Sequence, residues 1–208
     1  MSTAPAPLSR WRPTPVRFAR LMLGLVVFGA GEALLVASEL GNSPWTVLAE
    51  GVALQTALAV GTATVAVSFV VLLLWVPLRQ RPGLGTILNA IVVGLALDAT
   101  LLLLPGDIWL GVRIAFVPLG IALVGLGSGL YLTSRFGPGP RDGLMTGLHR
   151  TTGLSLRVVR AGIEIGAVTV GFVLGGTVGV GTVAFAVAIG PAVQAGVFAL
   201  GGRDTASL

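Results

Sequence analysis

The chain has 208 residues, of which 54% are hydrophobic and only 10% are charged, whereas a soluble domain is about a quarter charged. This composition excludes an ordinary soluble globular protein, and the absence of cysteine excludes disulfides, thiolate metal sites and thiol catalysis. The formal net charge of +5 comes from arginines scattered at segment ends, without the basic, aromatic-interleaved surface that would indicate nucleic-acid binding.

Six apolar segments are long enough to cross a membrane as helices, which takes roughly 20 residues each. A Pro- and Ser-rich stretch precedes them, and we expect residues 1–15 to be a disordered cytoplasmic tail. Two shorter and more polar stretches follow the first and the fourth segment and predict short helices. The predicted spans cover about residues 17–38, 57–78, 84–104, 112–134, 157–174 and 180–200, and the predicted short helices cover 44–56 and 140–151.

The two halves of the chain repeat each other at an offset of 96 residues, as from Gly41 to Gly137. The pattern G-x-x-P-x-x-x-L-x-x-G begins at both of these glycines, and G-x-G-T begins at both Gly83 and Gly179. Matched glycines indicate shared backbone geometry, because glycine permits tight turns and close helix approach. Repetition from Arg17 onward also argues against a cleaved signal peptide in the first segment.

The repeat divides the chain into a first unit at 16–106, a second unit at 107–202 and a short cytoplasmic tail at 203–208. Three crossings in each unit would insert the second unit upside down. With the N-terminus inside, nearly all arginines lie on the cytoplasmic side, as the positive-inside rule requires. We therefore predict an all-α membrane protein of six transmembrane helices, arranged as two inverted three-helix repeats, each with a short extra helix after its first span. Both termini are expected in the cytoplasm.

The two short helices begin at Pro44 and Pro140, and Thr46 and Asp142 are their expected N-caps. Two placements stay open for them. They could lie on the membrane surface as connectors, or they could dip in from opposite faces and bring their N-termini together at mid-depth. In the second case their N-termini would attract an anionic group.

Motifs of the second half resemble the YczE/YitT-type family of bacterial integral membrane proteins. They are G-x-G-P-R-D-G-L-M at 137–145, the Arg160 and Glu164 pair, and L-G-G-x-x-G-x-G-T at 174–182. The family's P-W-D is Pro44-Trp45-Thr46 in the first half, without the carboxylate. The resemblance implies a multi-pass protein of the bacterial cytoplasmic (inner) membrane and a transporter whose solute it does not identify. It implies no catalytic residues.

Ionisable residues inside apolar segments are costly, so each is a functional candidate. Arg160 and Glu164 share one helix face, either as a structural pair or as part of a site. A guanidinium suits a carboxylate or phosphate, and a buried carboxylate can bind and release protons. The candidates for substrate binding are Glu32, Pro44, Trp45, Pro140, Arg141, Asp142, Arg160 and Glu164, and those for coupling are Glu32, Asp98 and Glu164.

The leading prediction is a secondary transporter of a small organic or anionic solute. A non-transporting membrane scaffold for a partner enzyme or assembly is the alternative, and a passive channel would require subunits to assemble. Two glycine pairs four residues apart, Gly162 with Gly166 and Gly171 with Gly175, predict close packing within the chain rather than the seam of a homodimer. Whether the chain forms a homodimer stays open. We predict no enzyme activity, cofactor or metal, since no nucleophile–base pair or metal spacing is visible, and the expected partners are the lipid bilayer and the solute.

Overall fold

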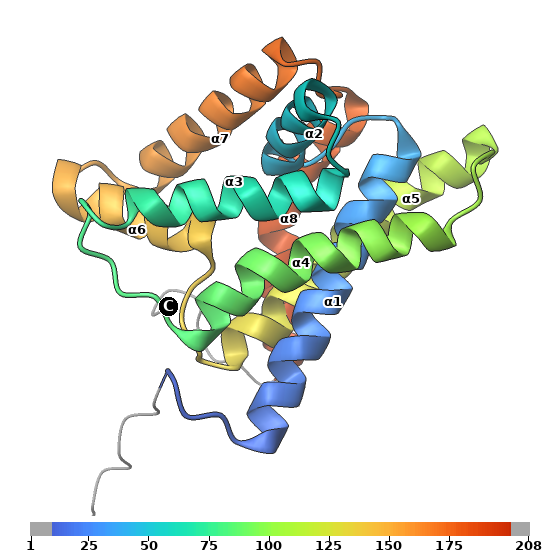
Figure 1. The fold of residues 1–208 in the computed structure, drawn as a ribbon. Helices are drawn as coiled ribbons and strands as arrows, with labels where there is room; N and C mark the ends of the chain where they lie inside the picture. Colours follow the sequence, from blue (N-terminus) through green and yellow to red (C-terminus); the bar gives the residue numbers. More distant parts are fainter. Residues whose placement is uncertain (1–9, 201–208) are drawn as a thin grey trace, which may run out of the picture.

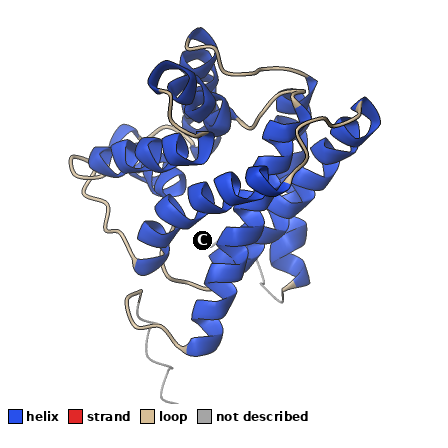
Figure 2. Ribbon diagram, turned by 45° about the vertical axis from the view of Figure 1, so that its right-hand side comes forward, coloured by secondary structure: helices blue, strands red, loops and turns tan. Residues whose placement is uncertain are grey.

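The computed structural model describes residues 10–200, which form eight α-helices and no strand (Figures 1 and 2). Residues 1–9 of the predicted N-terminal tail and the whole predicted C-terminal tail, 203–208, lie outside the described residues. Each predicted helix is present, with its ends within four residues of the predicted ones. The helices are α1 (Pro15–Ser38), α2 (Pro44–Thr56), α3 (Val60–Leu74), α4 (Leu84–Leu103), α5 (Leu110–Thr133), α6 (Pro140–Thr152), α7 (Leu156–Val173) and α8 (Val180–Ala199).

Prolines and glycines set the helix starts. Pro44 and Pro140 are the first residues of α2 and α6, where the N–H that proline lacks would have no intrahelical partner. Gly83 and Gly179 are the N-caps of α4 and α8, and each donates its N–H to the hydroxyl of the threonine three residues later, at 3.0 and 3.3 Å. The two G-x-G-T motifs are therefore helix-start turns.

Four helices, α1, α4, α5 and α8, are long and apolar enough to cross a membrane. The other two predicted spans do not meet these criteria alone. α3 has 15 residues, about 22 Å at 1.5 Å per residue, which is short of a hydrocarbon core of roughly 30 Å. α7 carries Arg157, Arg160 and Glu164 among its 18 residues. α2 and α3 meet the criteria as a pair bent by 110°, so the described chain has four candidate spans, or five with this pair.

The helices form two groups (Figure 1). In the first group, α1 packs against α5 and α4, and α5 packs against α8. In the second group, α2 packs against α7 and α3, and α6 packs against α3 and α7. Contacts of α4 with α3 and α6 join the groups.

The crossing of α1 and α5 is held close by four glycines. A Cβ on Gly24 would lie 2.9 Å from the Gly127 carbonyl oxygen, and a Cβ on Gly31 would lie 2.7 Å from that of Gly120. The earlier glycine of α1, Gly24, contacts the later glycine of α5, Gly127, and the later one, Gly31, contacts the earlier one, Gly120. The two helices therefore run antiparallel. Gly24 and Gly120 are repeat equivalents, as are Gly31 and Gly127, so each contact is the other with the halves exchanged.

Two backbone hydrogen bonds between the halves are also equivalent to each other when the halves are exchanged. The N–H of Gly85, at the start of α4, donates to the Phe136 carbonyl at 3.0 Å. The N–H of Gly181, at the start of α8, donates to the Leu40 carbonyl at 2.8 Å. The loop before each short helix thus binds the start of the last helix of the opposite half.

Glycine packing in α7 differs from the prediction. Gly162 and Gly166 are exposed, and a Cβ on either would meet no atom within 4 Å in residues 10–200. Gly171 instead lies against α2, where its Cβ would be 2.5 Å from the Leu48 nitrogen. The prediction of close packing within the chain is therefore wrong for Gly162 and Gly166 and confirmed for Gly171, which lies in the last turn of α7.

Candidate functional site

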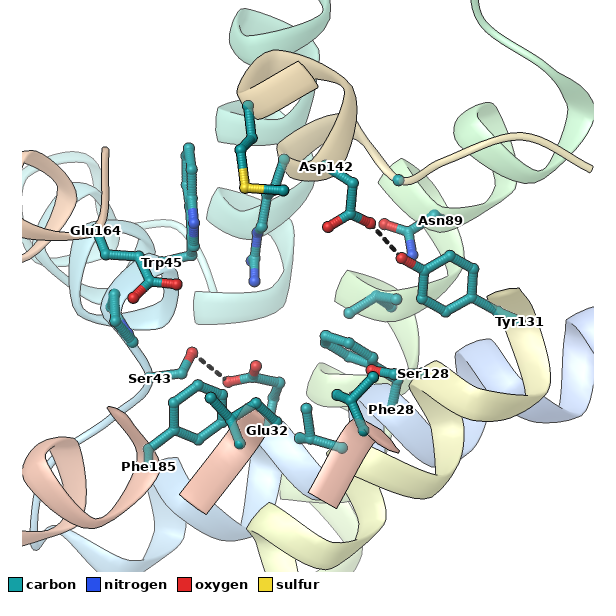
Figure 3. A pocket seen from close by; sticks show the side chains of 18 of the residues that line it. Phe28, Glu32, Ser43, Trp45, Asn89, Ser128, Tyr131, Asp142, Glu164 and Phe185 are labelled. Carbon is teal, nitrogen blue, oxygen red and sulfur yellow. Dashed lines mark hydrogen bonds between the residues drawn. The ribbon is translucent and has the colours of Figure 1, made fainter. Parts of the chain in front are cut away.

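A cavity of about 310 Å³ lies among the helices, and side chains from all eight of them line it (Figure 3). Ligand pockets usually have about 300–1,000 Å³, so this volume suits a small solute. The N-terminal ends of α2 and α6 both reach the cavity, through Pro44 and Trp45 in one and Arg141 and Asp142 in the other. Neither helix is capped by the side chain of its N-cap residue.

Equivalent positions of the two repeats line this cavity, but their chemistry differs. Arg141, Arg160 and Glu164 of the second half each correspond to an uncharged residue of the first half. In one pair the charge is in the first half instead, because Glu32 corresponds to a serine. The lining pairs are Phe28 and Val124, Glu32 and Ser128, Ser43 and Gly139, Trp45 and Arg141, Thr64 and Arg160, Ser68 and Glu164, Asn89 and Phe185, and Val93 and Ile189.

Glu32 projects from α1 into the cavity and is only 1% exposed (Figure 3). Its Oε2 accepts hydrogen bonds from the Ser43 and Thr46 hydroxyls, each at 2.7 Å. Its Oε1 is buried and has no hydrogen-bond partner within residues 10–200. Because a buried acceptor without a partner costs about 1–3 kcal/mol, this oxygen is a place for a donor from a bound molecule.

Arg141 lies over the ring of its repeat equivalent Trp45, with 5.2 Å between Cζ and the ring centroid. Its guanidinium makes no hydrogen bond or ion pair with any described residue. Burial lowers the pKa of Arg141 from its ordinary value, although the negative charges of Glu32 and Asp142 oppose this shift. Arginine stays protonated in proteins, so the cavity contains a cation with unused donors.

Asp142 accepts a short hydrogen bond from the Tyr131 hydroxyl (Figure 3). The predicted N-caps are wrong, because Thr46 and Asp142 lie inside the first turns and use their side chains on Glu32 and Tyr131 instead. Pro140 does not line the cavity. Its carbonyl accepts a hydrogen bond from the indole of buried Trp75 at 2.9 Å, which fixes the start of α6.

Arg160 and Glu164 both line the cavity and are joined by a bond of 2.8 Å between Nε and Oε1. Their side chains are 48% and 29% exposed, so they lie towards an open side of the cavity. An exposed pair at this spacing contributes only about 0.3–0.5 kcal/mol to stability. Both predicted roles, structural pair and site residues, therefore stay predictions.

Asp98 lies outside the cavity lining. Its carboxylate accepts hydrogen bonds from the backbone N–H groups of Gly61 at 2.6 Å and Thr62 at 2.9 Å, and from the Thr62 hydroxyl at 3.1 Å. These N–H groups belong to the first turn of α3, whose own N-cap residue has no side-chain hydrogen bond. Asp98 therefore caps α3, and its coupling role stays a prediction.

Sequence reasoning missed several polar residues of the cavity. Ser43 and Thr46 hold Glu32, Tyr131 holds Asp142, and Asn89 lines the wall. The one available indication was the repeat, which aligns Thr46 with Asp142 and sets Tyr131 one turn after the equivalent of Glu32. No group of three or more His, Cys, Asp or Glu within residues 10–200 has a geometry that could hold a metal ion.

Comparison with known proteins gives relatives but no named activity. A family described as "Family of unknown function (DUF6198)" matches residues 15–196. The chain is 45% identical over 192 residues to an uncharacterised protein of Haemophilus influenzae, covering 92% of this chain and 88% of that protein. It is 30% identical over 178 residues to the uncharacterised membrane protein YczE of Bacillus subtilis, covering 84% and 82%. The resemblance to YczE-type proteins is thereby confirmed. No solved structure matches the chain.

Proposed function

We propose that this chain, which belongs to the DUF6198 family and is similar to the membrane protein YczE, is a secondary transporter of a small polar solute. One observation carries the proposal: equivalent positions of two sequence repeats line a single cavity. Transporters built from repeats bind their substrate at the interface between them, beside the ends of interrupted helices. Here α2 and α6 are the short helices, and they line the cavity with Trp45 and Arg141, which occupy equivalent positions of the two repeats.

The topology that we propose has six crossings, two inverted repeats and both termini in the cytoplasm, in a bacterial inner membrane. The antiparallel course of α1 and α5 supports it, because inversion requires equivalent spans to run in opposite directions. The exchange of contacts between the halves is what a two-fold axis would produce. With α2 and α6 re-entrant, their unpaired first N–H groups would lie beside a polar cavity and not in lipid.

Single cysteines test the topology, because the chain has none of its own. Gln80, between α3 and α4, and Val178, between α7 and α8, lie in repeat-equivalent loops. We expect an impermeant maleimide to label Val178→Cys in intact cells and Gln80→Cys only after permeabilisation. Labelling of both from the same face would refute inversion.

Transport is tested with purified protein in liposomes exposed to a mixed set of small polar metabolites, with the internal solutes measured by mass spectrometry. We expect at least one solute to accumulate, and Glu32→Gln to abolish its accumulation. Folded protein that moves none of the set would count against transport.

A membrane scaffold is the second candidate, favoured by the exposed apolar face of α7, which includes Ile165, Val170 and Phe172. It predicts that neutral substitutions at Arg141 and Glu32 leave cellular function intact, while polar substitutions on this face abolish it. The transporter predicts the reverse pattern.

A further inference from the structure

We propose that the solute is a small zwitterion, whose anionic group binds the Arg141 guanidinium and whose ammonium group binds Oε1 of Glu32. This inference deepens the transporter function proposed above and rests on it. The two protein groups come from different halves of the chain, so a bound zwitterion would join the halves across the cavity.

The charges that line the cavity oppose a solute of net negative charge. Three carboxylates, of Glu32, Asp142 and Glu164, face two guanidiniums, of Arg141 and Arg160. An additional anion would enter a site whose formal charge is already negative, whereas a zwitterion adds none. We therefore expect a solute that has an anionic group but no net negative charge.

The partners already present show which groups are available. Arg160 and Glu164 are paired with each other, and Asp142 receives the Tyr131 hydroxyl. Arg141 keeps all its N–H donors unused, and Glu32 keeps one oxygen unused, within the described chain. No ion pair joins Arg141 to Glu32 there. A molecule with an acceptor at one end and a donor at the other satisfies both.

The surroundings of each group fit one end of such a molecule. A guanidinium presents parallel N–H donors that match the two oxygens of a carboxylate, and the uncapped N-terminus of α6 favours negative charge beside it. At the other end, Phe28 and Phe185 line the cavity with Glu32, and aromatic faces attract an ammonium group (Figure 3). The cavity of about 310 Å³ limits the solute to a small molecule.

Binding to the purified full-length chain tests the proposal. The probes are glycine, β-alanine, 4-aminobutyrate and 5-aminopentanoate, in which the distance between carboxylate and ammonium increases. Acetate and propylamine serve as probes with one charged end each. We expect at least one zwitterion to raise the unfolding temperature and, by calorimetry, to bind at least about tenfold more tightly than either one-ended probe.

Two variants locate the ends. Glu32→Gln and Arg141→Gln are each expected to weaken binding by at least about tenfold, the loss typical of one charge-assisted hydrogen bond. Arg141 makes no hydrogen bond or ion pair with a described residue, so its substitution removes no such structural contact. Glu39→Gln is the matched control, since Glu39 is an exposed carboxylate outside the cavity that pairs with Arg113. It should leave binding unchanged.

Three outcomes would overturn the zwitterion: no probe binds, acetate binds as tightly as the best zwitterion, or both cavity variants bind it like the control. Uptake into liposomes separates this proposal from the transporter itself. If a zwitterion binds but is never taken up, the transport function is refuted and the zwitterion site stands. If other solutes are taken up and no zwitterion binds, the zwitterion site is refuted and the transport function stands.

Discussion

The close crossing of α1 and α5 predicts that Gly31→Ala destabilises the fold. The new Cβ would lie 2.7 Å from the Gly120 carbonyl oxygen and 2.8 Å from the Val124 nitrogen, where ordinary contact begins at 3.4 Å. The two helices would have to separate locally by about 0.7 Å, an overpacking that costs roughly 1–3 kcal/mol. Because Glu32 on α1 and Val124 and Ser128 on α5 line the cavity, a local separation of these helices should also weaken solute binding.

The assay is reversible unfolding in mixed detergent micelles, followed by circular dichroism. Gly166→Ala is the matched control, because it makes the same chemical change inside a helix with no described atom within 4 Å of the new Cβ. The gain in helix propensity is common to both variants, so their difference isolates the packing cost of about 1–3 kcal/mol. Gly120→Ala adds a Cβ to the same contact from α5, 2.8 Å from the Gly31 carbonyl oxygen, and should lower the free energy of unfolding by a similar amount. Equal stability of Gly31→Ala and Gly166→Ala would refute the close crossing.

Three further changes test single contacts. Glu50→Gln should lower the free energy of unfolding by about 2–3 kcal/mol, because this carboxylate accepts bonds from Asn42 Nδ2 at 2.8 Å, Thr177 N at 2.6 Å and Thr177 Oγ1 at 3.0 Å. An unchanged denaturation midpoint would contradict this tie between the halves. Asp98→Ala should lower the free energy of unfolding by about 0.5–2 kcal/mol as a lost helix cap, without changing solute uptake. Loss of uptake by the folded variant would support the predicted coupling role of Asp98. Tyr131→Phe removes the hydroxyl that donates to Asp142 and should lower the free energy of unfolding by about 1–2 kcal/mol. An unchanged free energy of unfolding would show that this hydrogen bond does not stabilise the fold.

The helices could be predicted because their causes are local. Apolar length, the prolines at 44 and 140 and the glycines at 83 and 179 act within a few residues, and the helices begin where these residues predict. α3 is the main exception, since it ends at Leu74 and not near residue 78. Its next residue, Trp75, is buried and bonded to the Pro140 carbonyl, a contact 65 positions away along the chain. No local pattern contains that contact.

The site was predicted only in part for the same reason. From the sequence alone, Arg141 was a candidate because a guanidinium suits an anionic group, and Glu32 and Asp98 were candidates because charges in apolar segments are costly wherever they fold. Tertiary structure decided that the first two share a cavity, while Asp98 caps a helix elsewhere. It also brought the hydroxyls of Thr46 and Tyr131 against the cavity carboxylates. Serine, threonine and tyrosine are common in helices, and burying a hydroxyl is far less costly than burying a charge, so a hydroxyl in an apolar segment does not mark a site. Only the packed structure distinguishes Thr46 and Tyr131 from the other hydroxyl residues.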